Sequence, residues 1–111
     1  MEIRDEAQDG ITVVELVGRL DELATSDVDK AFSGLLSRGV TRMVLDMSSV
    51  EYVSSSGLRV LMMLYKAMKK CDGRLCFCGL SPFVAEVFDI SNLARLFTIE
   101  ATREDALKAL M

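Results

Sequence analysis

Stretches typical of β-strands alternate with stretches typical of α-helices along nearly the whole chain. A strand followed by a helix and a second strand is normally a crossover between parallel neighbours, so this order predicts an α/β fold. Asp9-Gly10 is a hairpin turn signal, which adds one antiparallel pair at the start. We therefore expect a mixed, mostly parallel sheet of four to five strands, drawn from residues 2–7, 11–17, 41–47, 74–79 and 97–100.

About four helices are expected between and after these strands. The first has Thr25 or Ser26 as its cap and ends at Gly39, with apolar residues spaced to form one face. The second runs from Gly57 to about Lys70, after a loop over residues 48–53. Ser81-Pro82 opens the third helix in a cap-then-proline pattern, and Thr102 caps the last one.

The length of 111 residues and the absence of any Pro- or Ser-rich linker predict a single domain over residues 1–111. Half of the residues are hydrophobic and 27% are charged, a composition typical of a folded chain rather than a disordered one. The longest strictly apolar run, Val60 to Tyr65, is far shorter than the ~20 residues that span a bilayer. The first ten residues are polar and acidic, so we expect no secretory signal and a soluble, cytoplasmic protein.

The charge balance and the residue types exclude several kinds of partner and site. Lys and Arg number 13 against 17 Asp and Glu, a net charge of -4, so neither nucleic acid nor an anionic membrane is expected as a direct partner. There is no His, the commonest general base and metal ligand. The spacing of Cys71, Cys76 and Cys78 does not match a four-ligand metal site, so small buried thiols are expected, with no metal and no cofactor.

The stretch EYVSSSGLRVLMMLYK, residues 51–66, contains the most informative feature of the chain. Ser54, Ser55 and Ser56 lie where a loop meets a helix N-terminus, a position where a hydroxyl or a phosphate can accept hydrogen bonds from free backbone N–H groups. Helix caps are the structural interpretation. A serine nucleophile would need a base, and in the absence of His it would need a Lys such as Lys66 or Lys69, both at least two helical turns away. No catalytic residue is therefore predicted.

The helix after the serines has a polar stripe that is suited to contact with another protein. At 100° per residue, Arg59, Lys66 and Lys70 fall on one side, and Met62 and Met63 flank them. Adaptable Met side chains beside an Arg are typical of interfaces. The alternative, that both Met residues fill gaps at the edge of the core, remains open at this point.

The chain resembles stand-alone STAS domains of the anti-sigma factor antagonist family, which act in bacterial partner-switching systems. The resemblance rests on GRLDELAT, on MVLDMSSVEYVSSSGLRVL, which is the most specific part, and on SPFVAEVFDISNL. The family consensus at the serines is close to Asp-Ser-Ser/Thr-Gly-Leu, in which the serine after Asp accepts a regulatory phosphate. Aligned on Gly57-Leu58, that serine is Ser55, while Ser54 stands where Asp is usual. Ser54 and Ser56 are the alternative phosphoacceptors.

The resemblance implies a regulatory protein and not an enzyme. Its unphosphorylated form would bind an anti-sigma factor that is also a serine kinase of GHKL-type fold, and a type 2C Ser/Thr phosphatase would reverse the phosphorylation. The alternative is a STAS scaffold subunit of a membrane transport or larger signalling complex that is never phosphorylated. We expect the partner-binding surface to comprise Gly18, Arg19, Asp21, Ser54, Ser56, Gly57, Arg59, Met62 and Met63.

Overall fold

A computed structural model describes residues 1–111 and confirms the predicted α/β fold with a mixed, mostly parallel sheet. The five strands lie in chain order, β1-β2-β3-β4-β5, with β1 antiparallel to β2 and all other neighbours parallel. Their bounds and those of the helices are β1 (Glu2–Gln8), β2 (Ile11–Leu20), α1 (Thr25–Ser37), β3 (Arg42–Val53), α2 (Ser55–Lys70), β4 (Arg74–Cys78), α3 (Pro82–Ile90), the short 3₁₀ turn η1 (Leu93–Arg95), β5 (Thr98–Glu100) and α4 (Arg103–Leu110).

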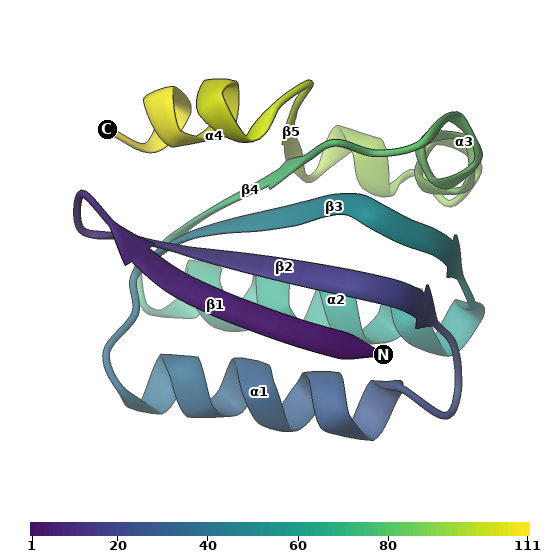
Figure 1. Ribbon diagram of the computed structural model, residues 1–111, viewed down its shortest axis with the longest axis horizontal. Helices are drawn as coiled ribbons and strands as arrows, with labels where there is room; N and C mark the ends of the chain where they lie inside the picture. Colours follow the sequence, from purple (N-terminus) through teal and green to yellow (C-terminus); the bar gives the residue numbers. More distant parts are fainter.

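Helices cover both faces of the sheet, as Figure 1 shows: α1 and α2 lie below it and α4 lies above it. The larger core is a cluster of 21 buried side chains on the α1 and α2 side, and a cluster of seven lies under α4. Alternate residues of β2 enter the two clusters, Val14 on one side and Val13 on the other. A strand with both faces covered must be apolar throughout, which explains the nearly continuous apolar run from Ile11 to Val17.

Two strands extend beyond the bounds expected from the sequence. β2 continues past Gly18 to Leu20, and β3 continues past Met47 to Val53, through the segment that we expected to be a loop. The pairing between them shifts register on either side of Gly18, whose φ of +118° suits glycine. Such irregularities interrupt the alternation of side chains between the two faces of the sheet. The sequence pattern of either strand alone therefore does not indicate where the pairing of β2 with β3 ends.

The expected starts of α3 and α4 are correct, whereas α2 begins at Ser55, two residues before the expected Gly57, and the expected cap of α1 is wrong. The hydroxyls of Ser54, Ser81 and Thr102 each accept a backbone N–H at the start of α2, α3 and α4. The expected cap of α1 by Thr25 or Ser26 is wrong, because the residue before α1 is Ala24 and has no capping side chain. The carboxylate of Asp21 accepts the Leu23 and Ala24 N–H groups in the turn just before this helix instead.

The cysteines lie in two kinds of environment. Cys76 and Cys78 are buried under α4, and burial raises the pKa of their thiols to about 11 and about 12, so both stay protonated at neutral pH. The expectation of burial is wrong for Cys71, which is exposed at the end of α2. No three His, Cys, Asp or Glu side chains are arranged to hold a metal ion. None of the helices has the length and apolar character required to span a bilayer.

An ion pair between the half-buried Arg103 and the buried Asp46 joins α4 to the middle of the sheet. Arg103 Nη2 lies 2.9 Å from Asp46 Oδ2, and the other carboxylate oxygen accepts the N–H and the hydroxyl of Ser48 at 2.9 and 2.7 Å. Burial by itself raises the pKa of Asp46, but the hydrogen bonds from Ser48 and the Arg103 guanidinium outweigh it and hold the pKa below its usual value. Asp46 is therefore ionised in the folded protein at neutral pH.

We expect Asp46→Asn to lower the free energy of unfolding at pH 7 by about 1–3 kcal/mol, because it removes the charged acceptor of Arg103. A carboxyl whose pKa is lower in the folded state than in the unfolded chain stabilises the protein at pH values above the unfolded-state pKa of about 3.9. This stabilisation is lost as the pH falls through the folded-state pKa. The difference between wild type and variant should therefore shrink below about pH 4. Urea unfolding across this range tests it, with the exposed Asp89→Asn as control. An unchanged difference in acid would contradict the ion-pair explanation.

Candidate functional site

The three serines mark the point where β3 ends and α2 begins, at the right-hand end of Figure 1. Ser54 is the N-cap of α2, and its Oγ accepts the Gly57 N–H at 3.0 Å. The same oxygen donates to the Leu20 carbonyl at 3.3 Å and lies 3.0 Å from Ser56 Oγ. If Ser56 donates to Ser54, both hydroxyls are satisfied within the protein. Ser54 and Ser56 therefore use their hydroxyls to join the end of β2 to the start of α2.

Ser55 differs from its two neighbours. It is exposed, and its hydroxyl makes no hydrogen bond within the protein. As the first residue of α2 it lies at the positive end of the helix dipole. Of the three serines, Ser55 is the one whose hydroxyl is available to another molecule.

Gly57 allows α2 to approach β2 closely. A Cβ on Gly57 would lie 2.5 Å from the Leu20 carbonyl oxygen, 2.9 Å from Leu20 Cγ and 3.2 Å from Val53 Cγ1. Backbone atoms cannot move aside as a flexible side chain can, so any other residue would displace the first turn of the helix. Gly57 is buried and therefore positions Ser55 without offering a surface to a partner.

Asp21 lies at the same edge of the sheet as the serines. β2 and β3 are parallel, and their last residues, Leu20 and Val53, are paired, so the loop after β2 begins beside Ser54. A shallow hollow of about 280 Å³ lies here, lined by Arg19, Asp21, Glu22, Leu23, Tyr52 and Ser54. Residues separated by more than thirty positions in the sequence thus share one surface.

Arg19 links the acidic and aromatic parts of this hollow. Its guanidinium carbon lies 4.4 Å from the centre of the Tyr52 ring, and its Nε lies 4.0 Å from Asp21 Oδ2. A cation over an aromatic face is attracted by the ring electrons, and the planar guanidinium stacks well there. Gly18 lies outside this hollow, in a neighbouring one that also includes Arg19 and Asp21.

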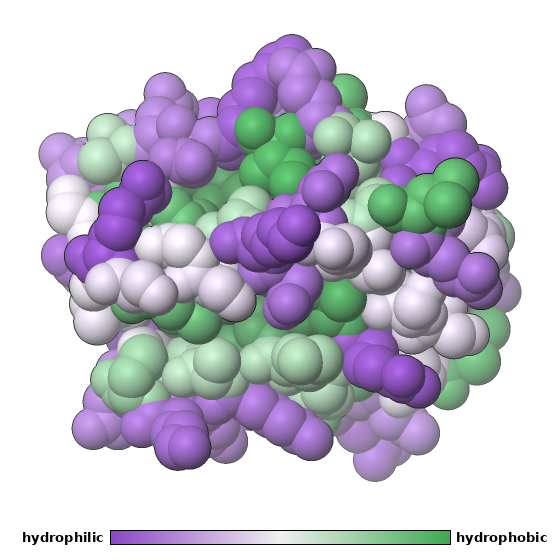
Figure 2. Space-filling model, turned by 90° about the horizontal axis from the view of Figure 1, so that it is seen from below, coloured by the Kyte–Doolittle hydropathy of each residue, from purple (hydrophilic) through white to green (hydrophobic).

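The outward face of α2 extends the surface away from the serines. Arg59, Met62 and Met63 follow Ser55 at i+4, i+7 and i+8, and such residues lie along one side of a helix. Arg59 is exposed and Met63 is 52% exposed, whereas Met62 is partly buried against the larger core. Figure 2 views the molecule from below Figure 1, from the α1 side, and shows hydrophobic patches between hydrophilic side chains.

Two exposed side chains near the serines, Leu23 and Phe83, and the half-buried Tyr52 were not among the residues predicted from the sequence. Leu23 is 90% exposed and lines the hollow, and Phe83 is 50% exposed. The rings of Tyr52 and Phe83 stack with their centres 6.3 Å apart. Phe83 could have been found, because it lies next to Val84 and off the buried face of α3. The sequence did not predict Tyr52 at this surface, because residues 48–53 were expected to form a loop.

Comparisons with known proteins agree on one family. The family model of the STAS domain matches residues 2–106. BtrV of Bordetella bronchiseptica, named as a candidate anti-sigma factor antagonist, is 33% identical over 101 residues, which are 91% of this chain and 87% of that protein. The anti-sigma F factor antagonist of Paenibacillus polymyxa is 27% identical, over 99% of this chain and 95% of its own. The crystal structure of an anti-sigma factor antagonist from Mycobacterium paratuberculosis superimposes with a TM-score of 0.90 at 26% identity, covering 98% of this chain and 92% of that one.

Proposed function

The chain belongs to the STAS domain family, and on this premise we propose that it is an anti-sigma factor antagonist. Its unphosphorylated form binds and sequesters an anti-sigma factor, and a sigma factor is thereby released. The relatives described above are named for the same role.

The proposed partner is an anti-sigma factor that is also a serine kinase of GHKL-type fold. It phosphorylates Ser55 and so ends the interaction, and a type 2C Ser/Thr phosphatase restores the binding form. The antagonist itself catalyses no reaction and needs no cofactor, because ATP is bound by the kinase. This cycle belongs in the cytoplasm, with the sigma factor.

The observation that carries this proposal is the free, exposed hydroxyl of Ser55 between two satisfied ones. A kinase needs a hydroxyl that can approach its phosphate donor. Phosphorylation of Ser54 or Ser56 would break the hydrogen bonds of that hydroxyl and loosen the junction of β2 with α2. Ser54, which stands where the family usually has Asp, accepts a backbone N–H just as an Asp cap would. The substitution therefore preserves the helix start while removing a negative charge next to Ser55.

A phosphate on Ser55 suits the folded protein but not a complex. It adds roughly -1.5 to -2 charges at a helix N-terminus, where an anion is stabilised, and Arg59 lies one turn further along the helix. The same charge would enter a contact surface that contains the acidic Asp21 and Glu22, and its cation, Arg19, already lies against Asp21 and the Tyr52 ring. Burying it without a paired cation costs several kcal/mol, so phosphorylation switches the compatibility of the interface without rearranging the fold.

Exposed and half-buried apolar side chains around Ser55 supply the proposed contact area. Leu23, Tyr52 and Phe83 lie on the side of the β2 loop and α3, and Met63 lies on the side of α2. Aromatic and Met side chains are enriched where protein partners bury their surfaces. The contact therefore extends to both sides of the phosphoacceptor.

Mapping of the phosphorylated residue by mass spectrometry tests the function. The chain is incubated with ATP and a cognate GHKL-type kinase, and phosphate is expected on Ser55 alone. Incorporation at Ser54 would show that the alignment is wrong by one residue. A kinase that binds without transferring phosphate would favour the scaffold role.

Met63→Asp should weaken binding to this kinase by at least about tenfold, which corresponds to 1.4 kcal/mol, because it places a charge in the proposed apolar contact. The melting temperature should be nearly unchanged, since Met63 is 52% exposed. Calorimetric titration and thermal melts measure the two effects. Ile90→Asp, at a residue 76% exposed at the far end of α3, is the matched control and should bind normally. A lower melting temperature with unchanged affinity would assign Met63 to the core instead.

A further inference from the structure

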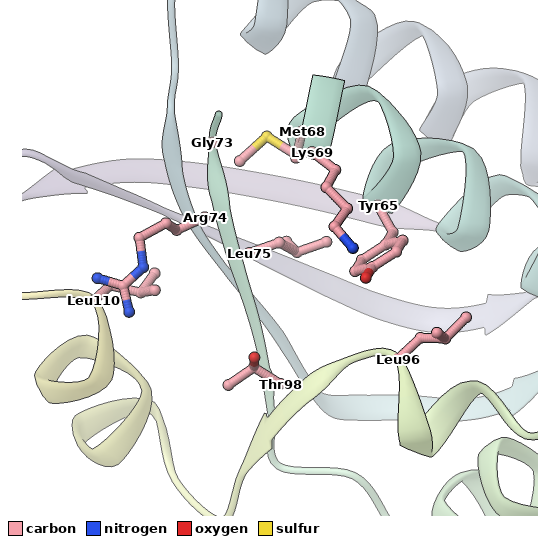
Figure 3. A pocket seen from close by; sticks show the side chains of 9 residues that line it. All are labelled: Tyr65, Met68, Lys69, Gly73, Arg74, Leu75, Leu96, Thr98 and Leu110. Atoms are coloured by element: carbon pink, nitrogen blue, oxygen red, sulfur yellow. The ribbon is translucent and has the colours of Figure 1, made fainter. Parts of the chain in front are cut away.

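We propose that a pocket at the end of α2 remote from the serines binds a small organic anion with an apolar tail. The pocket has a volume of about 220 Å³ and is formed by residues of α2, β4, α4 and the segment around the start of β5. Figure 3 shows its side chains, with Tyr65 and Lys69 on one wall and Arg74 and Leu110 on the other.

The pocket exists because β5 is short. Its three residues pair only with Cys76 to Cys78 of β4, so the outer edge of Arg74 and Leu75 has no strand partner. The side chains of α2 and α4 flank this uncovered corner from the two faces of the sheet. Neighbouring residues of a strand point to opposite faces, which explains how Leu75 lies between the walls while Arg74 reaches toward α4.

Most of the lining is apolar. Tyr65, Leu75 and Leu96 present their side chains to the space, and the last of these is 49% exposed. A cavity of roughly 150 Å³ holds a benzene molecule, so this pocket has room for a ring or a short chain of similar size. The exposed apolar surface would lose contact with water on binding, which stabilises an apolar ligand.

Two cations flank the pocket, and no acidic residue lines it. Lys69 and Arg74 form no ion pair in the structure, although acidic residues outnumber basic ones in the chain. Lys69 Nζ lies 5.4 Å from the centre of the Tyr65 ring. Arg74 donates from Nη2 to the Ala109 carbonyl oxygen at 2.8 Å, which leaves its other N–H groups free. The charge at the rim is complementary to a carboxylate or phosphate group.

The apolar walls and the two cations together favour a ligand that is both apolar and negatively charged. An inorganic anion would leave the apolar walls uncovered, and an uncharged apolar compound would leave the two cations unpaired. A peptide added as a strand needs a longer edge than two residues, since strands usually have about 5–6. The site is independent of the proposed function, because 14 residues of α2 separate Lys69 from Ser55, a distance of about 21 Å along the helix.

Titration of the full chain with phenylbutyrate, followed by backbone amide NMR shifts, tests the proposal. Saturable shifts are expected at residues 65–75 and 96–98 but not at the serines. Phenylbutanol, which has the same tail without the charge, and inorganic phosphate, which lacks the tail, should each bind at least about fivefold more weakly.

Lys69→Gln should weaken phenylbutyrate binding about threefold or more, because it removes one exposed cation. Lys69 makes no side-chain hydrogen bond, so the variant should fold normally, and thermal melts verify this. Lys66→Gln, one turn earlier on α2 and outside the pocket lining, is the matched control and should bind like wild type. Equal binding of phenylbutanol, shifts centred on the serines, no saturable shift, or equal losses in both variants would overturn the proposal.

Discussion

Phosphorylation of Ser55 should weaken binding to the partner kinase by at least about a hundredfold, which corresponds to about 2.8 kcal/mol. The loss is expected because a doubly charged group would be buried beside Asp21 and Glu22, where the cation of the hollow, Arg19, already lies against Asp21 and the Tyr52 ring. Arg59 and the helix N-terminus stabilise the phosphate in the free protein, so its free energy of unfolding should change by less than about 1 kcal/mol.

Calorimetric titration of the kinase with four forms of the chain measures this effect. Ser55→Ala should bind like the unphosphorylated wild type, since the Ser55 hydroxyl makes no hydrogen bond that the variant would lose. Ser55→Asp should bind more weakly, and the phosphorylated chain most weakly. Equal affinities for all forms would rule out a phosphorylation switch at this residue.

Ser54→Ala separates the structural role of a serine from the regulatory one. The variant loses the helix cap and the bond to Leu20, so its free energy of unfolding should fall by about 1 kcal/mol. Phosphate incorporation at Ser55 should persist. Complete loss of phosphorylation in this variant would identify Ser54 as the acceptor.

Gly57→Ala should lower the free energy of unfolding by about 2–4 kcal/mol, the largest stability effect expected of a single methyl group here. The added Cβ would lie 2.5 Å from the Leu20 carbonyl oxygen, so α2 must move away from β2. The same movement would shift Ser55 relative to Asp21 and weaken partner binding. Urea unfolding with partner titration at low temperature, where the variant stays folded, measures both effects.

Gly34→Ala is the matched control for this prediction. Gly34 lies within α1, and a Cβ there would meet no atom within 4 Å. Alanine lowers the conformational entropy of the unfolded chain and favours the helix, so this variant should be more stable by about 0.5–1 kcal/mol. If both alanine variants gained stability, the close approach of α2 to β2 would not be the reason for glycine at position 57.

The helices were predictable because their signals are local. The apolar residues of α1 recur at helical spacing, and Ser81 and Thr102 accept N–H groups only three residues further along the chain. The parallel order of the strands followed from their alternation with helices. The helix signals depend on interactions within a few residues, whereas the parallel order of the strands follows from the general geometry of strand-helix-strand connections.

In contrast to the helices, β2 and β3 end where they do because the two strands pair with each other. Residues 48–53 form a strand because they pair with the end of β2, with a register shift next to Gly18. The same pairing brings Tyr52 beside Arg19 and close to Phe83 of α3. A partner thirty or more positions away leaves no trace in the local pattern, so this side of the candidate surface could not be derived from the sequence.

By itself, the sequence determined the α/β class, the positions of the helices and the presence of three hydroxyls at the start of α2. Only the tertiary structure distinguished those hydroxyls. Leu20, 34 residues before Ser54, supplies the carbonyl oxygen that accepts the Ser54 hydroxyl, and Ser56 lies against the same hydroxyl. Ser55 remains free because it lies on the solvent side of the first turn of α2, whose other side packs against β2 at Gly57. Which serine is free is therefore a consequence of packing between distant segments, not of the serines' order in the chain.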